Sequence, residues 1–441
     1  MRPPARSRAP LVLKFGGASL LEPDRVVRVV RNARAGDAPV VVIVSAREGV
    51  TDLLLEAIRR PQGIRRHREI VRDLRQKHPG LPSEGRRQLE RLGHLLHVVE
   101  RTGQSDPPLV DRILSQGERL AAHWIAESLR RAGEPATAVE ADHLGLITDN
   151  AYGASRIVLD RSRSHVRRGL GRLLDRGLVP VVTGFFGRSL EGRVATLGRG
   201  GSDYTAAAIA AILGAGRVEL VKRHVAVLSA DPRDVPKARP IAELSYEEAE
   251  ELAHFGARVL HPLTIEPARA YGVRITVRSL AEPGLATTIG PARPGRRNRA
   301  ITILRPLRLL RLRVPGGRQR PGVVADITER LRAANVNVVQ LFTSSAVLCL
   351  VLEPVRLSTA LRALRPIVAE GAAAVEGAVR IALVTVIGDG VLHDLDRLPT
   401  NAVLGAEGMS ATPRALSLIV PEGRSPRVAR VLHAALVERE R

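Results

Sequence analysis

Little cysteine, few aromatic residues and no long apolar run set the first limits on this chain. A single cysteine, Cys349, excludes a disulfide framework and a thiolate metal cluster, and this favours a cytoplasmic protein. No apolar stretch approaches the roughly 18 residues that a membrane-spanning helix needs, and the first residues lack the apolar core of a signal peptide. Aromatic residues make up 2% of the chain, too few for the stacking platforms of single-stranded nucleic-acid binders.

Lysine is also scarce, although the formal net charge is +23. Only four basic residues are lysines (Lys14, Lys77, Lys222 and Lys237), and the other 64 are arginines spread over both halves of the chain. An even spread without a basic stripe indicates a compositional bias rather than a polyanion-binding face. We therefore expect no nucleic-acid partner and no membrane partner, and we regard each lysine as an unusual choice.

At 441 residues the chain is long enough for two or three domains. Apolar runs such as LVLKFGG, PVVVIVSA and LVPVVTGFFG alternate with segments of helical periodicity. This alternation predicts an α/β domain with a mainly parallel sheet over residues 1–292, with a helical flank at about 60–110. A segment rich in proline, glycine and arginine, residues 290–300, reads as a linker.

Two smaller units are expected beyond this linker, over residues 300–378 and 379–441. The first shows the order strand, helix, strand, strand, helix, and each unit is expected to be a small α+β sandwich of the βαββαβ type. The second begins with VRIALVTVIGDG and has only a few residues, near 393–398, for its first helix. The second unit is therefore predicted to be a shortened version of the first.

Two glycine clusters lie where anions are commonly bound. Gly16 and Gly17 follow an apolar strand that carries Lys14, and TLGRGGSDY, residues 196–204, opens an alanine-rich helix. Bare backbone N–H groups at a helix start favour negative charge, and the carboxyl ends of parallel strands meet at one edge of a sheet. The two clusters with Lys14 therefore predict a polyphosphate site. Neither a P-loop nor a complete dinucleotide-binding fingerprint is present.

Several longer motifs resemble those of the aspartokinases. Together with the two C-terminal units, these motifs span nearly the whole chain. They are LVLKFGGASL, VVIVSAREGVTD, ILSQGERLAA, TGFFGRSLEGRVATLGRGGSDYTAAA and SADPRDVPKARPIAELSYEEAEELAHFGARVLHPLTIEPA. The resemblance implies a three-layer αβα amino-acid-kinase fold followed by tandem ACT domains of the ferredoxin-like type. It also implies a cytoplasmic homodimer.

The implied activity is transfer of the ATP γ-phosphoryl group, with Mg²⁺ bound through the phosphates, to the side-chain carboxylate of L-aspartate. The product would be 4-phospho-L-aspartate, the first step towards lysine, threonine and methionine. A carboxylate is already ionised near neutral pH, so this chemistry needs positioning and charge compensation rather than a general base. No protein-held metal is expected.

The resemblance also implies roles for individual residues. Lys14 and Asp203 would be catalytic, with Lys14 at the transferring phosphoryl group and Asp203 orienting either Lys14 or the Mg²⁺ shell. Arg199 would bind a substrate carboxylate, and Glu118 the ammonium. Ser45 and Thr51 would complete the substrate pocket. The nucleotide and its phosphates would be held by Gly16, Gly17, Gly200, Gly201, Ser202, Lys222, Ser229, Asp231, Arg233 and Arg258.

The chain departs from the family in the loop that usually lines the nucleotide. Lys222 to Ser229 replaces a segment that commonly reads T-D-V-D-G-V-Y-T, so two acids and a glycine are lost and two positive charges are added. Two alternatives to an aspartate kinase follow. One is a kinase of the same fold with another small acid or nucleotide as substrate, and the other is a non-catalytic regulatory protein with ACT domains.

ACT pairs of this family bind an end-product amino acid as effector. Asn337, Thr343 and Ser344 are the residues expected to contact it. Val339 and Ser345 stand where lysine-sensitive members carry acids, so a lysine side chain would lack partners for its ammonium group. We therefore expect weak inhibition by lysine or none.

Overall fold

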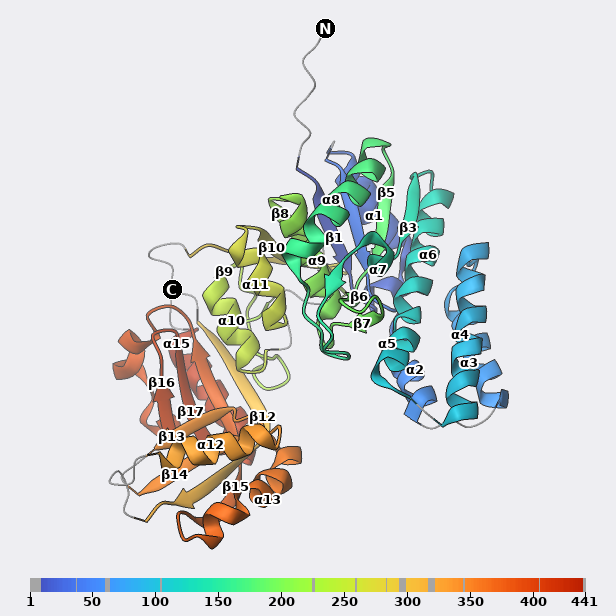
Figure 1. Ribbon diagram of the computed structural model, residues 1–441. Helices are drawn as coiled ribbons and strands as arrows, with labels where there is room; N and C mark the ends of the chain where they lie inside the picture. The colour runs from blue at the N-terminus through green and yellow to red at the C-terminus, as the bar shows by residue number, and fades with distance from the viewer. Residues whose placement is uncertain are drawn as a thin grey trace. The chain divides into compact units, whose positions relative to one another are not determined.

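The computed structural model describes residues 9–36, 38–59, 64–103, 105–223, 227–257, 260–282, 284–292, 299–315, 322–343, 346–403 and 405–438. The chain forms two compact units (Figure 1). The first comprises residues 1–227, 240–253 and 258–294, and the second comprises 228–239, 254–257 and 295–441. Two short segments of the expected first domain, 228–239 and 254–257, thus cluster with the C-terminal part of the chain.

An eight-stranded sheet is the centre of the first unit. Its order is β3-β5-β2-β1-β8-β10-β11-β9, and of its adjacent pairs only β10 and β11 run antiparallel. The strands are β1 (Leu11–Phe15), β2 (Val40–Val44), β3 (Ala136–Val139), β5 (Val179–Thr183), β8 (Arg217–Lys222), β9 (Glu243–Ser245), β10 (Arg274–Ser279) and β11 (Ala286–Gly290). The expectation of a mainly parallel sheet is confirmed.

Helices cover both faces of this sheet, which gives the three layers expected. α1 (Pro23–Arg34) and α6 (Gln116–Arg131) pack on the face that carries Leu13 and Phe15 of β1. α8 (Leu159–Asp175) and α9 (Gly201–Leu213) cover the other face, with α9 against β1, β2 and β8. Because side chains alternate along a strand, Lys14 points away from the Leu13 face and towards α9.

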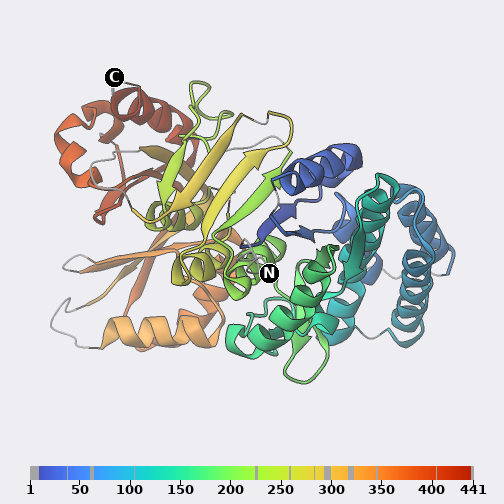
Figure 2. The same ribbon diagram turned by 90° about the horizontal axis from the view of Figure 1, so that it is seen from above.

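The remaining elements of the first unit surround this sandwich. α3 (Ile64–Lys77) packs on α4 (Ser83–Thr102), and α4 packs on α6, which forms a helical flank visible in both ribbon views (Figures 1 and 2). The others are η1 (Ser19–Leu21), α2 (Val50–Arg59), α5 (Pro107–Leu114), α7 (Ala141–Leu144), α10 (Tyr246–His254), α11 (Pro262–Ala270) and a small sheet of β4 (Ile147–Thr148), β6 (Phe186–Ser189) and β7 (Val194–Thr196).

The second unit is built on one antiparallel sheet of six strands in the order β13-β14-β12-β15-β17-β16. These are β12 (Ala300–Arg313), β13 (Gln340–Thr343), β14 (Val347–Leu352), β15 (Ala374–Ile387), β16 (Gly408–Ala411) and β17 (Ala415–Pro421). The helices are α12 (Val323–Ala333), α13 (Leu357–Ala369), α14 (Thr400–Val403) and α15 (Ser425–Leu436), with short turns η3 (Pro354–Arg356), η4 (Val391–Arg397) and η5 (Glu422–Arg424).

Two hydrophobic cores lie along this sheet and share its long strands. Leu310 and Leu312, late in β12, pack with α12, α13 and β14, whereas Ile301, early in β12, packs with β15, β17 and α15. The sheet therefore carries the tandem ACT arrangement that the sequence predicted, but β12 contributes to both cores. In the second core, η4 and α14 stand where the first core has the full helix α12.

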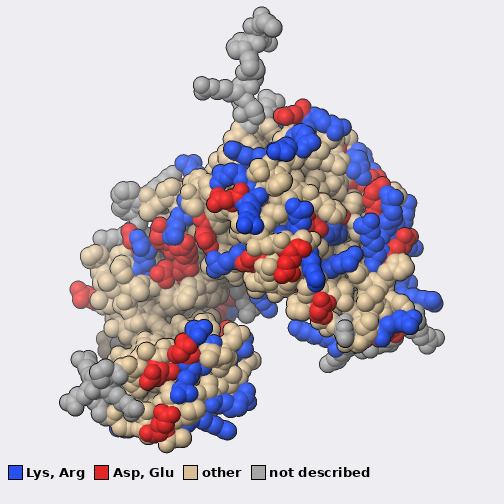
Figure 3. Space-filling model, viewed as in Figure 1, with Lys and Arg blue, Asp and Glu red and all other residues tan. Residues whose placement is uncertain are grey.

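Charge on the surface is mixed. On the face drawn in Figure 3, basic and acidic side chains are interspersed. Within the described residues, no helix has both the length and the apolar character to cross a bilayer.

Candidate functional site

The site lies at the carboxyl ends of three adjacent strands. There the first glycine cluster, Gly16 and Gly17, lies near the start of α9, which carries the second cluster. β1 lies between β2 and β8, so the segments that follow Phe15, Val44 and Val221 emerge side by side. Ser45 donates its backbone N–H to the carbonyl of Phe15 at 3.2 Å, and Gly16 donates to the carbonyl of Val221 at 3.4 Å. The residues after each strand are therefore tied to the neighbouring strand.

A buried carboxylate lies between two ammonium groups at this edge. Lys14 Nζ of β1 lies 2.6 Å from Asp203 Oδ1, and Lys222 Nζ at the end of β8 lies 3.0 Å from Asp203 Oδ2. Lys14 and Asp203 are buried, and Lys222 is partly exposed. Two of the four lysines of the chain thus meet at one aspartate in the first turn of α9.

Burial and charge act in opposite directions on this group. Desolvation lowers the pKa of Lys14, and the Asp203 carboxylate only partly opposes this effect. Desolvation also acts to raise the pKa of Asp203, but the charges of Lys14 and Lys222 outweigh it and hold that pKa well below its usual range. Asp203 is therefore ionised near neutral pH, and each of its oxygens lies at ion-pair distance from one ammonium group.

The glycines of both clusters allow close backbone approaches. Gly200 caps α9 in the left-handed region, at φ 73°, and a Cβ there would lie 2.4 Å from Cβ of His261. A Cβ on Gly17 would lie 2.5 Å from the carbonyl oxygen of Ala46. Any larger residue at these two positions would force the neighbouring segments apart, so the close approach of these segments depends on glycine.

Glu118 lies in the first turn of α6, where its carboxyl group is buried. Its Oε1 accepts the backbone N–H of Ala46 at 2.8 Å, and its Oε2 has no hydrogen-bond partner among the described residues. Burial raises the pKa of Glu118 to about 8, although the Ala46 N–H and the charge of Lys14 oppose the rise. Once Glu118 is ionised, its unpartnered oxygen is suited to accept the ammonium group of a substrate.

The other residues expected to bind the substrate are less buried than Glu118. Ser45 and Thr51, which follow β2 and begin α2, are partly buried. Arg199 is exposed and forms no ion pair with a described residue. Ser202 is buried in the first turn of α9, packed where Gly184 lacks a side chain. The guanidinium of Arg199 is thus unengaged next to Gly200.

The residues expected to bind the nucleotide around the loop that differs from the family are divided between the two units. Lys222 belongs to the first unit, whereas Ser229, Asp231 and Arg233 belong to the second. There Ser229 Oγ lies 2.9 Å from His433 Nε2, and Asp231 pairs with Arg233 at 2.6 Å. Arg258 lies outside the described residues. A contact of Ser229, Asp231, Arg233 and Arg258 with a nucleotide stays a prediction.

Asn337 and Thr343, two of the expected effector residues, lie in the part of the second unit that is built around the first core. Asn337 precedes β13 and Thr343 ends it, and both side chains are exposed. β13 is an edge strand of the six-stranded sheet. Ser344 lies outside the described residues.

The sequence analysis missed one buried residue that shapes the site. Asp111 of α5 accepts the N–H of Gly153 at 2.9 Å and the N–H of Thr196 at 2.7 Å, and it also accepts the Thr196 hydroxyl at 2.8 Å. Thr196 ends β7 and leads directly into the glycines before α9. Asp111 therefore fixes the start of that segment. Its sequence distance of 85 residues from Thr196 leaves no local signal for this role.

Comparison with known proteins agrees with this geometry. A model of the amino acid kinase family matches residues 9–279. An aspartokinase of Thermus thermophilus is 39% identical over 175 residues, which are 39% of this chain and 42% of that protein. The chain thus spans less than half of that curated relative.

Two further comparisons cover more of the chain. The lysine-sensitive aspartokinase 3 of Escherichia coli is 30% identical over 365 residues, or 78% of each protein. The crystal structure of Escherichia coli aspartokinase III with aspartate and ADP superposes with a TM-score of 0.83 at 25% identity, and covers 97% of this chain and 99% of that one. The chain therefore belongs to the amino acid kinase family, and within it to the aspartokinases.

Proposed function

We propose that this protein is an aspartate kinase, which transfers the γ-phosphoryl group of ATP to the side-chain carboxylate of L-aspartate. The observation that carries the proposal is the Lys14–Asp203–Lys222 group beside the unpartnered oxygen of Glu118. The relative of known structure that shares the fold over nearly the full length was solved with aspartate and ADP. These features supply what the transfer of a phosphoryl group between two anions requires.

Lys14 offsets the negative charge that builds up between the attacking carboxylate and the phosphoryl group. Within the described residues, the Asp203 carboxylate forms ion pairs with the two ammonium groups, so it acts by holding Lys14 and Lys222 in place. Because both of its oxygens are already paired, we assign Mg²⁺ to the phosphates of ATP and to no carboxylate of this group. The backbone of Gly16, Gly17, Gly200 and Gly201 lines the path of the phosphates. The N–H groups of Gly17 and Gly200 are the donors that we assign to them, because those of Gly16 and Gly201 already donate to the carbonyls of Val221 and Gly198.

The substrate side follows from the remaining charges. Glu118 Oε2 accepts the aspartate ammonium, and Arg199 binds the α-carboxylate through its free guanidinium. Ser45 and Thr51 complete the wall of this pocket. Lys222, an ammonium group where the family commonly has threonine, adds a second cation for the phosphates.

Regulation and assembly follow the same family. We propose that the second unit binds an amino-acid effector near Asn337 and Thr343, and that the chain forms a homodimer. The Escherichia coli relative is lysine-sensitive by name. Val339 in place of an acid supports a different effector preference here.

The activity is tested with the purified full chain by coupling ADP release to NADH oxidation. ADP release should require aspartate, ATP and Mg²⁺ together, and hydroxylamine should trap the acyl phosphate as the hydroxamate. Lys14→Ala should lower kcat by a factor on the order of 10³ without loss of the folded state. A panel of other small acids in place of aspartate tests the alternative substrates. No ADP release with any acid at millimolar concentration would refute a kinase function.

A further inference from the structure

The segment that leads from the end of β2 into the first turn of α2, residues 45–51, packs directly on α6. We call it the substrate loop, because the residues at its two ends are assigned to the aspartate pocket. Ala46 donates its N–H to Glu118 Oε1 at 2.8 Å. A Cβ on Gly117 would lie 2.7 Å from Cβ of Ala46, so the loop and the helix touch where Gly117 has no side chain. The shape of the aspartate pocket therefore depends on how this loop is held against α6.

Arg47 is the one basic residue of the substrate loop, and its guanidinium lies over an aromatic ring. Arg47 Cζ is 5.2 Å from the centroid of the Trp124 ring, which belongs to the same helix as Glu118. The Arg47 side chain forms no ion pair with a described residue, and its Nε is buried without a hydrogen-bond partner among those residues. A cation within about 6 Å of the face of an indole ring is attracted by the ring. The Trp124 ring is thus the partner that the described structure offers to this charge.

Trp124 is a fixed surface for this contact. Its side chain is buried, and its Nε1 donates to the carbonyl of Pro79, in the turn between α3 and α4, at 2.9 Å. The ring of His78, from the same turn, packs at 88° to the indole with the centroids 5.5 Å apart. Burial lowers the pKa of His78 to about 4, although its contact with the Leu74 carbonyl opposes the shift. The imidazole is therefore neutral near pH 7 and does not repel Arg47.

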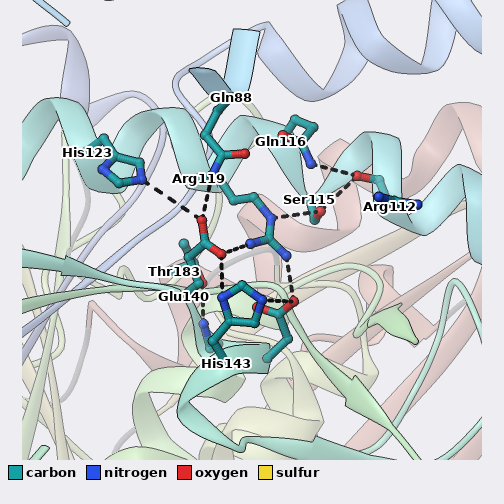
Figure 4. A network of polar contacts seen from close by, with 11 residues as sticks. Gln88, Arg112, Ser115, Gln116, Arg119, His123, Glu140, His143 and Thr183 are labelled. Atoms are coloured by element: carbon teal, nitrogen blue, oxygen red, sulfur yellow. Dashed lines mark hydrogen bonds and ion pairs between the residues drawn. The ribbon is translucent and has the colours of Figure 1, made fainter. Parts of the chain in front are cut away.

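The helix that carries Trp124 is itself anchored by the residue after Glu118. Arg119 donates one N–H to Glu140 and another to Asp142 Oδ2, the latter at 2.6 Å (Figure 4). Its guanidinium also lies over the Phe186 ring, 4.8 Å from the centroid. These contacts tie α6 to the start of α7 and to β6. The substrate loop is thus attached to a helix that is held in place by other parts of the first unit.

The hydrogen bond from Ala46 holds the loop less firmly before aspartate binds than afterwards. With a pKa of about 8, Glu118 is mostly protonated near neutral pH. A hydrogen bond to a neutral carboxyl group is weaker than one to a carboxylate. The contact between Arg47 and Trp124 does not depend on this proton, so it supports the loop in the free protein.

We propose that Arg47 is a positioning residue for the aspartate substrate, because its stacking on Trp124 holds the substrate loop against α6. Ser45 and Thr51 are then placed to receive the substrate before it arrives. Arg47 acts through the loop and is not assigned a contact with aspartate. The inference rests on the proposed aspartate kinase function, whereas the contact between Arg47 and Trp124 can be tested without it.

Steady-state kinetics on the full chain test the proposal. Arg47→Met keeps the length of the side chain but removes the charge, and it should raise the KM for aspartate about three- to tenfold, the effect expected for loss of one cation–indole contact. The KM for ATP should change less than the KM for aspartate. The matched control Arg59→Met removes an exposed arginine at the end of α2 and should change either KM less than about twofold.

Two further readouts separate a positioning role from a general loss of structure. Arg47→Lys keeps the charge but not the planar guanidinium, so its KM for aspartate should lie between those of the parent and Arg47→Met. Trp124 is the one tryptophan of the chain, so tryptophan emission reports on its surroundings alone. The emission should differ between Arg47→Met and the parent but not between Arg59→Met and the parent. Arg47→Gln, a second uncharged variant, carries the same expectations as Arg47→Met if the latter does not fold.

The proposal is overturned if the uncharged variant leaves the KM for aspartate within about twofold of the parent, or if Arg47→Lys is no better than that variant. Unchanged tryptophan emission in the uncharged variant would also overturn it. If the parent releases no ADP, the proposed function fails by itself, and titration calorimetry with aspartate decides the inference. It stands if the uncharged variant binds aspartate at least about threefold more weakly than the parent, and it falls if the two bind alike or if neither binds.

Discussion

Aspartate binding should strengthen steeply as the pH rises, because Glu118 must lose a proton before it can accept the substrate ammonium. The pKa of Glu118 in the free protein is about 8. At about pH 6 only ~1% of the molecules carry the carboxylate, against ~75% at about pH 8.5. If only the ionised form binds, the apparent affinity rises about 75-fold over this range, or roughly 2.5 kcal/mol.

The affinity is measured by titration calorimetry at several pH values. At about pH 7, where ~90% of Glu118 is protonated, binding should release close to one proton per aspartate, and this count follows from titrations in two buffers of different ionisation enthalpy. Glu118→Gln keeps an oxygen for the Ala46 N–H but cannot ionise. This variant should bind weakly at every pH and release no proton from this position.

The raised pKa of Glu118 also predicts how the stability of the folded protein depends on pH. A folded pKa near 8 lies above the usual carboxyl value of 4.5. The folded state then holds the proton more tightly, so the contribution to stability is full below about pH 4.5 and is lost as the pH rises through about 8. Above that pH, Glu118→Gln should be more stable than the parent by roughly 3–5 kcal/mol in denaturant unfolding.

A KM for aspartate that stays flat from about pH 6 to 8.5, with no proton released, would refute the role assigned to Glu118.

Three further expectations test other parts of the site. Lys222→Thr should raise the KM for ATP about tenfold and change the KM for aspartate less than about twofold, while the exposed Lys237→Thr should change neither in steady-state kinetics. Asp111→Ala should lower stability by about 1–3 kcal/mol in urea unfolding and also lower kcat, because the backbone N–H groups of Gly153 and Thr196 lose their acceptor; an unchanged kcat would argue against a positioning role. L-Lysine at millimolar concentration should inhibit less than about twofold in initial-rate assays, and strong inhibition would contradict the reasoning from Val339.

The sequence predicted the elements of the site that follow from local pattern. The apolar run LVLKFGG predicted a strand that carries Lys14 and ends in glycines, and glycines before an alanine-rich helix predicted a bare helix start next to Asp203. These signals depend on neighbours within a few residues. The three layers and the parallel sheet follow from the same alternation of strands and helices.

What the sequence did not predict depends on contacts between distant segments. The sequence predicts that Lys222 binds the nucleotide as one of two added positive charges, but no local pattern indicates that the pairing of β1 with β8 brings its ammonium group to Asp203. Asp111 acts on Thr196 across the packing of α5 on β7. The long strand β12 serves two cores, and a pattern of apolar residues alone gives no sign of where one core ends and the next begins.

Burial raises the pKa of Glu118 against the opposing charge of Lys14, and a neutral acid at this position suits the charge of the rest of the site. Lys14 and Lys222 against Asp203 leave one positive charge, which suits the arrival of an anionic nucleotide. A permanently ionised Glu118 would cancel that charge and would itself be buried without a partner for Oε2. With its raised pKa the carboxyl group stays neutral until an ammonium group occupies the adjoining space, and it then ionises against that group. Substrate binding thus adds the positive ammonium group and the negative Glu118 carboxylate at the same time. The net positive charge around Lys14 is therefore kept for the phosphoryl transfer.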